Sequence, residues 1–250
     1  MTTNFSLILP CYNEEENISH LYNEFKKIPL KNENAELIFV NNGSTDHTEK
    51  KIDETIEDSK SNNNFGIIVK KVNLKTNKGY GGGISAGLNS AEGDYIGWAH
   101  ADLQTPLVDF YKLYNQVKGE KRIFGKGNRI NNRGYDGMIS RFHEVFASLI
   151  LGQKMREINA QPKIFHKTML GLFPNMPNKW TTIDTYVFYI CLLNKIKIVE
   201  MDVVFKTRVY GQSKWKNNFG NFIEHLFFNI IYLIKLRFSN ERNNTTKYNT

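Results

Sequence analysis

The feature that most constrains the fold is a repeating order of short apolar runs and helical periodicities in the first hundred residues. Runs rich in β-branched and aromatic residues alternate with stretches whose apolar residues recur every three or four positions, as at Ile18, Leu21 and Phe25. The predicted strands cover Phe5–Leu9, Glu36–Val40, Gly66–Val72 and Tyr95–Ala99. Strands that alternate with helices form parallel sheets covered by helices. The predicted fold class is therefore α/β, with a doubly wound, mostly parallel sheet and helices on both faces.

The second half of the chain continues this pattern less regularly. A further strand is predicted over Arg122–Gly127, an amphipathic helix over Met138–Leu151 and a β-rich segment over Lys195–Val209. No internal repeat or flexible linker separates these elements from the first half. The predicted organisation is one domain over residues 1–215, an amphipathic helix over 216–238 and a disordered tail over 239–250.

The composition favours anionic partners and a reducing compartment. The 250 residues carry a formal net charge of +8 and two cysteines, Cys11 and Cys191. A surplus of cations suits nucleotides, anionic lipid or nucleic acid, and we rank nucleic acid last because it rests on the charge alone. The cysteines lack metal-binding spacing and the N-terminus lacks a signal-peptide pattern. A cytoplasmic location is therefore predicted.

The predicted C-terminal helix is apolar, but it is too short and too charged to span a membrane. Phe219–Phe238 is dense in Phe, Ile and Leu, and its uninterrupted core is only Leu226–Ile234. A helix in the interface of the cytoplasmic membrane face and a helix packed on the sheet or in a dimer interface explain the pattern equally well. The cations that would lie near lipid phosphates in the first case are Lys235, Arg237, Arg242 and Lys247.

A polar stretch follows the fourth predicted strand. His100, Asp102 and Gln104 alternate with apolar residues, so an extended backbone would send all three side chains to one side at the carboxyl end of that strand. Open α/β sheets hold their ligands at this edge. Carboxylate and carboxamide oxygens suit Mg²⁺ or Mn²⁺, although a turn or a helix cap would need the same residues. Thr105 is the predicted N-cap of the next helix, which Pro106 opens.

A cluster of glycines follows the third predicted strand. Gly81, Gly83 and Ala86 match a relaxed dinucleotide fingerprint, which would suit a nicotinamide-dependent oxidoreductase. The fingerprint should follow the first strand directly, whereas this cluster comes after the third strand and a polar spacer. A loop with a purely structural role is at least as good an explanation.

Scattered cations form a second candidate set. Arg208 and Lys214 flank a hydroxyl and a glycine in one predicted loop, a composition that suits phosphate binding. Arg129 and Arg141 precede them along the chain. Each cation alone would be explained equally well as a solvated surface residue.

Taken in order, the motifs resemble those of family 2 glycosyltransferases with the nucleotide-diphospho-sugar transferase (GT-A) fold, nearest to the branch that uses dolichyl or polyprenyl phosphate. The resemblance extends from Leu7 to Lys214. It rests on Leu9-Pro10-Cys11-Tyr12-Asn13-Glu14-Glu15, Asn41-Asn42-Gly43-Ser44-Thr45-Asp46, Asn77-x-Gly79-x-Gly81, Ala101-Asp102-Leu103-Gln104, Gly127-Asn128-Arg129, Ser140-Arg141 and Arg208-x-x-Gly211-x-Ser213-Lys214. The ordered series is specific, whereas each motif alone is weak.

The resemblance implies an inverting transferase that moves a sugar, in most cases a hexose, from a nucleotide-diphosphate donor to a polyprenyl-phosphate or glycan acceptor at a membrane surface. It assigns donor binding to Pro10, Tyr12, Glu14, Asn42, Lys78, Ala101, Asp102, Arg208, Ser213 and Lys214. It assigns acceptor-phosphate binding to Arg129, Ser140 and Arg141. The implied metal, Mn²⁺ or Mg²⁺, would lie at His100, Asp102 and Gln104, and the implied catalytic residues are Asp102 and Asp184.

Two motifs depart from the family pattern, at three positions. His100 stands where the metal motif begins with an aspartate, and Asn41 and Asn42 stand where two aspartates are usual. Neutral histidine ligates Mn²⁺ better than Mg²⁺, and an asparagine still hydrogen-bonds a base or a ribose. The substitutions are compatible with an active enzyme of altered donor preference and with a non-catalytic protein that binds nucleotide sugars or glycans. We favour the enzyme.

Overall fold

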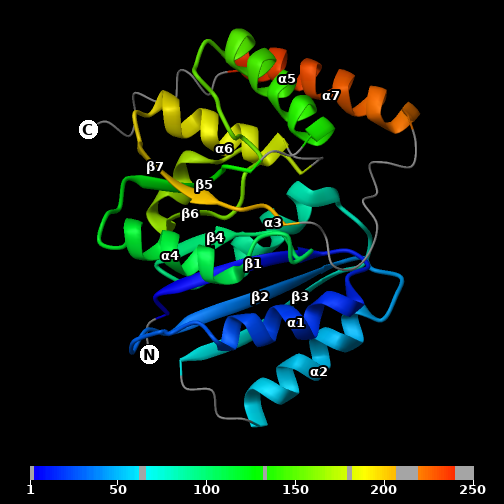
Figure 1. Ribbon diagram of the computed structural model, residues 1–250, viewed down its shortest axis with the longest axis vertical. Coiled ribbons are helices and arrows are strands. Elements are labelled where there is room, and N and C mark those ends of the chain that lie inside the picture. Colours follow the sequence, from blue (N-terminus) through cyan, green and yellow to red (C-terminus); the bar gives the residue numbers. More distant parts are fainter. Residues whose placement is uncertain (1–2, 62–65, 132–133, 179–181, 207–218, 240–250) are drawn as a thin grey trace.

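The computed structural model describes residues 3–61, 66–131, 134–178, 182–206 and 219–239. Its centre is a seven-stranded sheet in the order β3-β2-β1-β4-β6-β5-β7 (Figure 1). The strands are β1 (Phe5–Cys11), β2 (Ala35–Asn42), β3 (Ile67–Leu74), β4 (Tyr95–Trp98), β5 (Ile123–Arg129), β6 (Lys163–His166) and β7 (Lys197–Val203). Only β6 runs against its neighbours, β4 and β5. The predicted mostly parallel α/β fold is confirmed, and all four strands predicted in the first half are present.

Helices cover both faces of the sheet. They are α1 (Glu15–Lys26), α2 (Thr48–Ser61), α3 (Gly79–Ser90), α4 (Leu107–Val117), α5 (Gly134–Leu151), α6 (Thr182–Leu193) and α7 (Phe219–Arg237), with a 3₁₀ helix, η1 (Lys167–Leu172). One core lies under α1, α2 and α4, and the other under α3, α5, α6 and α7. Successive β1 side chains serve the two cores in turn, since Leu7 and Leu9 face the first and Ile8 the second.

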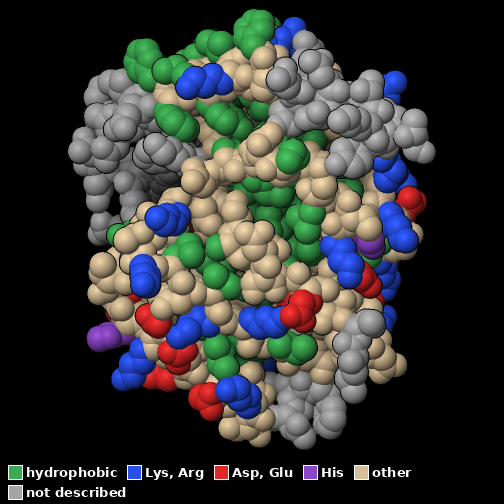
Figure 2. Space-filling view, turned by 180° about the vertical axis from the view of Figure 1, so that it is seen from behind, with side chains coloured by type: hydrophobic (Ala, Val, Ile, Leu, Met, Phe, Trp, Pro, Cys, Tyr) green, Lys and Arg blue, Asp and Glu red, His purple; other side chains and the backbone are tan. Residues whose placement is uncertain are grey.

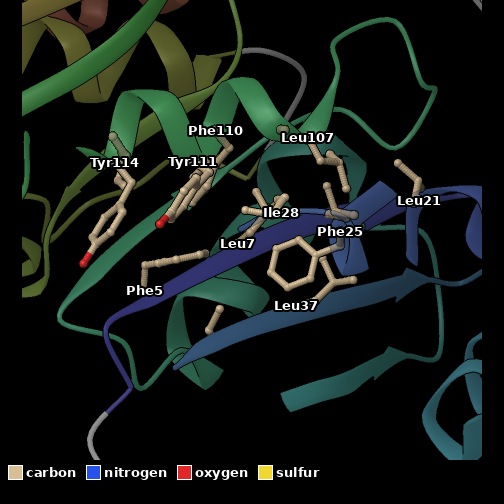
Figure 3. Packing of buried hydrophobic residues seen from close by; sticks show 14 of the residues in the cluster. Phe5, Leu7, Leu21, Phe25, Ile28, Leu37, Leu107, Phe110, Tyr111 and Tyr114 are labelled. Atoms are coloured by element: carbon tan, nitrogen blue, oxygen red, sulfur yellow. The ribbon is translucent and has the colours of Figure 1, made fainter. Parts of the chain in front are cut away.

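The first core shows why α1 and α4 pack where they do. Phe110, Tyr111 and Tyr114 recur at helical spacing on α4 and point toward β1 (Figure 3). The Phe5 ring lies with its centroid 4.7 Å from that of Tyr114 and 5.7 Å from that of Phe110. Fully burying a side chain of this size stabilises the fold by about 1.5–3 kcal/mol. This packing fixes α4, and with it the chain that leaves β4.

The glycine cluster forms the helix α3 and brings it close to the sheet. A Cβ atom on Gly87 would lie 2.3 Å from Ile8 Cγ2, and one on Gly83 would lie 3.1 Å from Pro10 Cβ. The helix begins at Gly79, so the glycines that we assigned to a loop lie in a helix. Helix–strand packing therefore explains these glycines without a dinucleotide.

The predicted C-terminal helix is present as α7, which packs against α5 and α6. Arg237, in its last turn, donates a hydrogen bond of 2.7 Å from Nη1 to the carbonyl oxygen of Leu151 at the end of α5. Among the residues that the structure describes, no helix has both the length and the hydropathy to cross a membrane. The division of the chain at residue 215 stays a prediction, and the tail beyond Ser239 lies outside the described residues.

Candidate active site

Three strand ends meet at one edge of the sheet. β1 pairs in parallel with β2 on one side and with β4 on the other, with Cys11 opposite Asn41 and Ile8 opposite Trp98. Of the predicted donor residues, Tyr12 and Glu14 follow β1, Asn42 ends β2, and Ala101 and Asp102 follow β4. Parallel sheets hold their ligands at this edge, and Asp102 follows β4 there.

Asp102 lies in a turn rather than in an extended strand. β4 ends at Trp98, Leu103 has a left-handed backbone with φ of 60°, and the Gln104 amide donates a hydrogen bond of 3.2 Å to Asp102 Oδ1. Our prediction of an extended backbone through Gln104 was therefore wrong, because an aspartate that accepts from the second residue after it competes with strand geometry. Asp102 is 5% exposed and Ala101 beside it is buried.

The predicted helix cap after this turn was also wrong. The N-cap residue of α4 is Pro106, and Thr105 Oγ1 is buried without a hydrogen-bond partner in the described structure. The Leu107 amide instead donates to Glu24 Oε2 on α1 at 3.2 Å. The Glu24 carboxylate of α1 thus accepts a hydrogen bond from the first turn of α4, the part that we predicted for Thr105.

His100 and Gln104 both contact the segment after β7. The His100 ring centroid lies 6.2 Å from that of Phe205 and 5.5 Å from that of Tyr80. Gln104 donates from Nε2 to the carbonyl oxygen of Lys206 at 2.9 Å, and the Lys206 amide donates back to the Gln104 carbonyl at 2.8 Å. The structure therefore ties the Asp102 turn to the chain that leads toward Arg208, Ser213 and Lys214. Those three predicted residues lie outside the described part of the chain.

Burial keeps His100 neutral. Desolvation lowers the pKa of His100 below its usual value, the positive charges of Lys163 and Arg129 act in the same direction, and the carboxylates of Asp102 and Asp184 oppose them. A neutral imidazole keeps a lone pair for a metal or a hydrogen-bond donor.

The metal-ligating groups around Asp102 suit an ion that also has a phosphate ligand. Among the described residues, no three His, Cys, Asp or Glu side chains lie close enough together to hold an ion alone. Asp102 offers a buried carboxylate, and the hydrogen bond from Gln104 Nε2 leaves its Oε1 without a partner in the described structure. Mg²⁺ is commonly held by one or two carboxylates together with substrate phosphates and water. Asp102 and Gln104 match that requirement.

Neutral amides hold the loops on the donor side. Asn42 is buried; it donates from Nδ2 to the Gly79 carbonyl at 2.9 Å and accepts from the Lys78 amide at 2.9 Å. Asn41 donates to Asn73 Oδ1 at 2.7 Å and accepts from the Ser44 amide at 3.1 Å. The two asparagines that stand where the family has aspartates therefore join the end of β2 to β3 and to the nearby loops.

The other predicted donor residues lie around the end of β1. Pro10 packs beside Gly83 of α3, and Tyr12 and Glu14 follow the strand. Glu14 accepts a hydrogen bond of 2.5 Å from Asn17 Nδ2, and its amide donates to Thr48 Oγ1 at 2.8 Å. Lys78 is exposed at the start of α3. Pro10, Tyr12, Glu14, Asn42 and Lys78 thus surround one end of the β1–β2 pair.

A separate surface hollow of about 760 Å³ lies along α2. Its lining residues are Asp46, His47, Glu49, Lys50, Asp53, Glu54 and Glu57. Carboxylates dominate this lining, so it would repel a nucleotide diphosphate. This hollow is therefore not a candidate donor site.

Arg129 lies at the end of β5, next to Phe205. Its Nε forms an ion pair with Glu157, its Cζ lies 6.0 Å from the Phe205 ring centroid, and its side chain is only 4% exposed. Arg129 Nη2 is buried and has no hydrogen-bond partner in the described structure. Ser140 and Arg141 lie on α5, where Arg141 is exposed. The hydrogen bonds and ion pairs of the described residues include no partner that Arg141 shares with Arg129.

Asp184 is fully buried at the start of α6 in a network that the sequence did not predict. It forms an ion pair with Lys163 Nζ at 2.7 Å and accepts from Trp98 Nε1 at 3.2 Å, whereas its Oδ2 has no partner among the described residues. Burial lowers the pKa of Lys163 to about 8, and the Asp184 carboxylate opposes that shift. The pair lies directly behind the strand end that carries His100 and Asp102.

Gln161 connects this pair to α3. The hydrogen-bond network places its amide oxygen 3.2 Å from Lys163 Nζ and 2.8 Å from the Tyr80 hydroxyl, with its amide nitrogen 3.1 Å from the Trp98 carbonyl oxygen. Tyr80 in turn lies beside His100. The available signal was Lys163 itself, a charged residue at the start of the otherwise apolar run Lys163-Ile164-Phe165.

Comparison with known proteins gives one consistent family. The profile described as glycosyl transferase family 2 matches residues 6–179. An uncharacterized glycosyltransferase of Synechocystis sp. is 36% identical over 222 residues, which are 86% of this chain and 65% of that protein. The undecaprenyl-phosphate 4-deoxy-4-formamido-L-arabinose transferase of Proteus mirabilis is 26% identical over 216 residues, which are 84% of this chain and 62% of that protein. This chain thus spans less than two thirds of the length of these relatives.

Solved structures show the same fold. Glucosyl-3-phosphoglycerate synthase from Mycobacterium tuberculosis, in complex with Mn²⁺, UDP-glucose and glycerol 3-phosphate, superimposes with a TM-score of 0.63 at 18% sequence identity. The match covers 94% of this chain and 80% of the synthase. The predicted nucleotide-diphospho-sugar transferase (GT-A) fold is confirmed.

Proposed function

Because the chain belongs to glycosyl transferase family 2, we propose that it transfers a sugar from a nucleotide-diphosphate donor to a polyprenyl-phosphate or glycan acceptor, with inversion at the anomeric carbon. The observation that carries the proposal is the buried Asp102 turn, which lies at the carboxyl end of β4 beside the loops after β1 and β2. A carboxylate in that place is suited to a diphosphate and its metal ion. The sugar and the base stay open.

The donor would lie over the ends of β1 and β2. Pro10, Tyr12 and Glu14 would line the base and the ribose, and Lys78, exposed beside Asn42, would meet a phosphate. Both ends of the Asn42 amide already bind the loop at Lys78 and Gly79, so Asn42 acts on the donor by holding that loop. Arg208, Ser213 and Lys214 remain proposed donor residues.

A divalent metal, Mn²⁺ or Mg²⁺, would be held by Asp102 and Gln104, with His100 as a further ligand that favours Mn²⁺. When bound, it would neutralise charge on the diphosphate leaving group. The Mn²⁺ in the complex of the Mycobacterium tuberculosis synthase supports this part of the proposal. The Asp102 side chain is held ready by its bond from the Gln104 amide.

The transfer would proceed by attack of an acceptor oxygen on the anomeric carbon while the bond from that carbon to the diphosphate oxygen breaks. A phosphate oxygen is already ionised near neutral pH and needs no base, whereas a hydroxyl needs one. Asp184 is the predicted base, but it is fully buried and already engaged in an ion pair with Lys163. This arrangement favours the phosphate acceptor over a glycan hydroxyl. Asp184 would then act mainly by positioning the strand end at Trp98.

The acceptor phosphate would be bound by Arg129, Ser140 and Arg141. Arg129 has a buried Nη2 without a hydrogen-bond partner in the described structure, and Arg141 is exposed on α5. Guanidinium groups bind phosphate through two parallel hydrogen bonds. The undecaprenyl-phosphate transferase of Proteus mirabilis among the relatives supports this acceptor class. With a lipid acceptor, the protein would work as a peripheral protein on the cytoplasmic face of a membrane.

The second candidate is a non-catalytic protein that binds nucleotide sugars or glycans. His100 at the metal motif favours it, since one carboxylate fewer weakens a metal site. The two candidates differ in turnover and not in donor binding.

A thermal-shift screen of nucleotide sugars with and without Mn²⁺, followed by a transfer assay with polyprenyl phosphates, tests the proposal. We expect one donor class to raise the melting temperature only with metal, and that donor to be turned over. Donor binding without turnover on any acceptor would select the second candidate. No stabilisation by any nucleotide sugar would contradict the enzyme and a non-catalytic nucleotide-sugar-binding protein alike.

A further inference from the structure

Two helices far apart in the sequence expose apolar stripes at the same end of the molecule. Nine of the thirteen large hydrophobic side chains that are exposed in the described structure belong to α5, to α7 or to Phe238 directly after α7. They are Met138, Phe142, Val145, Phe146 and Leu149, and Phe227, Ile231, Ile234 and Phe238. We refer to these nine residues as the α5–α7 face. Figure 2 shows hydrophobic side chains along the upper edge of the molecule, the edge that α5 and α7 form in Figure 1.

Each helix has a second apolar side, which is buried against the rest of the protein. On α5, Ala147 and Leu151 are fully buried, and Leu149, between them in sequence, is 74% exposed. On α7, Leu233 and Leu236 are buried, and Phe238 is 82% exposed. The other exposed residues of α5 lie four, seven, eight and eleven positions after Met138, so they form one stripe on the helix. Packing inside the protein therefore does not account for these stripes.

Soluble proteins rarely expose large apolar side chains in such concentration without a partner. Of the four remaining exposed hydrophobic residues, Ile68 lies on β3, Val108 lies on α4, and Ile130 and Val204 follow the paired ends of β5 and β7. The α2 surface offers a contrast, because its exposed side chains form ion pairs such as Lys51–Glu54 and Lys60–Glu57. The α5–α7 face is therefore specific to one end of the molecule.

The charges on the two helices identify the partner. Arg141 on α5 and Lys235 on α7 are exposed, and neither forms an ion pair within the described structure. The one carboxylate of these helices whose side chain the structure describes, Glu144, is buried. An apolar stripe with unpaired cations suits a bilayer that contains anionic lipid, whereas a self-complementary dimer contact would bring like charges together.

We propose that the α5–α7 face docks the protein onto an anionic lipid bilayer, with its apolar side chains in the interface and Arg141 and Lys235 at the lipid phosphates. The proposal deepens the proposed function, on which it rests for the acceptor class alone. Arg141 belongs both to this face and to the predicted acceptor site. Docking would bring a lipid phosphate to the enzyme by diffusion in the plane of the membrane instead of from water.

Vesicle co-sedimentation of the full chain tests the proposal. The probes are phosphatidylcholine vesicles and vesicles with equal shares of phosphatidylcholine and phosphatidylglycerol. We expect binding to the anionic vesicles, and a loss of at least about tenfold in partition for the double variant Leu149→Glu/Ile231→Glu, because two exposed apolar side chains are replaced by anions. Val108→Glu, which changes an exposed residue of α4, is the matched control and should bind like the wild type.

The remaining outcomes separate this proposal from the proposed function. Equal partition of the double variant and the wild type, or no vesicle binding by the wild type, overturns the docking surface. A dimer that sedimentation velocity detects in the wild type and not in the double variant, together with no vesicle binding, replaces the bilayer by a second copy and also overturns it. Nucleotide-sugar binding, followed by thermal shift, should be the same in both proteins. If the wild type binds no nucleotide sugar but still binds vesicles, the proposed function fails and the docking surface stands.

Discussion

The two sides of the candidate site are built from different interactions. On the donor side, neutral amides join the end of β2 to its neighbours, as in the pairs of Asn41 with Asn73 on β3 and Asn42 with Gly79 at the start of α3. On the acceptor side, buried cations are held by carboxylates, as in Lys126 with Glu200 at 3.0 Å and Lys163 with Asp184 at 2.7 Å. Asp102 lies between the two. The buried polar side chains at the end of β2, Asn41 and Asn42, are thus neutral, whereas Lys126 and Lys163 carry charge beneath the strand ends on the acceptor side.

The difference has consequences for stability and for chemistry. A buried ion pair is strongly destabilising when one partner is removed, whereas a lost amide hydrogen bond costs less. The buried cations also favour negative charge in the acceptor, which fits a phosphate nucleophile. Changes on the acceptor side should therefore reduce folding stability more than changes on the donor side.

The largest effect is expected at Asp102, where the two sides meet. Asp102→Ala should lower the rate of transfer by about three orders of magnitude, because the metal ion that neutralises the diphosphate would lose its main protein ligand. Steady-state assays with the donor found in the screen measure it. Asp94→Asn, which changes a half-exposed carboxylate paired with Lys167 at the start of β4, is the control and should leave the rate within about twofold of the wild type. An Asp102→Ala variant with the wild-type rate would remove the site assignment.

On the acceptor side, Lys163→Met should lower the free energy of unfolding by about 3–5 kcal/mol, because Asp184 would be left buried without its counter-ion. Urea denaturation measures the change. The double variant Lys163→Met/Asp184→Leu should recover most of the loss, since apolar residues of similar volume replace buried pairs at little cost. A loss as large in the double variant would show that the pair does not act as a unit.

On the donor side, Asn42→Ala should cost about 1–3 kcal/mol of stability, since the Lys78 amide and the Gly79 carbonyl lose their partner. Because the loop carries Lys78, KM for the donor should rise by a larger factor than kcat falls. Asn73→Ala is the matched control: it removes an amide of the same network next to Asn41, and KM should stay near the wild-type value. A change in kcat alone would place Asn42 in the chemical step.

The smallest effect concerns His143 on α5, beside the buried acceptor-side network. Burial lowers the pKa of His143 to about 4, against an opposing effect of Asp184, so the folded protein binds this proton less readily than the unfolded chain. The contribution of His143 to stability is therefore fully present above pH 6.5 and is lost as the pH falls toward 4, by about 1–2 kcal/mol at pH 5. His143→Gln should flatten the dependence of unfolding free energy on pH in this window. An unchanged slope would contradict the assignment.

The sequence was sufficient for the sheet but not for the contacts between its elements. Alternation of apolar runs with helical spacing predicted β1 to β4 because both periodicities are local. Two contacts were missed because each joins residues from distant elements: Glu24 of α1 accepts from the first amide of α4, and Lys163 pairs with Asp184. The Asp102 turn was missed for the opposite reason: a side chain that hydrogen-bonds two residues ahead overrode the apolar alternation. Arg208, Ser213 and Lys214 stay predictions.

The central claim is that Asp102 holds a divalent metal together with the donor diphosphate. The most direct measurement is a titration of Mn²⁺, followed by electron paramagnetic resonance, with and without UDP, on the wild type and on Asp102→Asn. Asparagine keeps the shape of the side chain and removes its charge. We expect UDP to tighten Mn²⁺ binding in the wild type, and Asp102→Asn to weaken binding by at least about tenfold. Equal Mn²⁺ affinity in the two proteins with UDP present would contradict the claim.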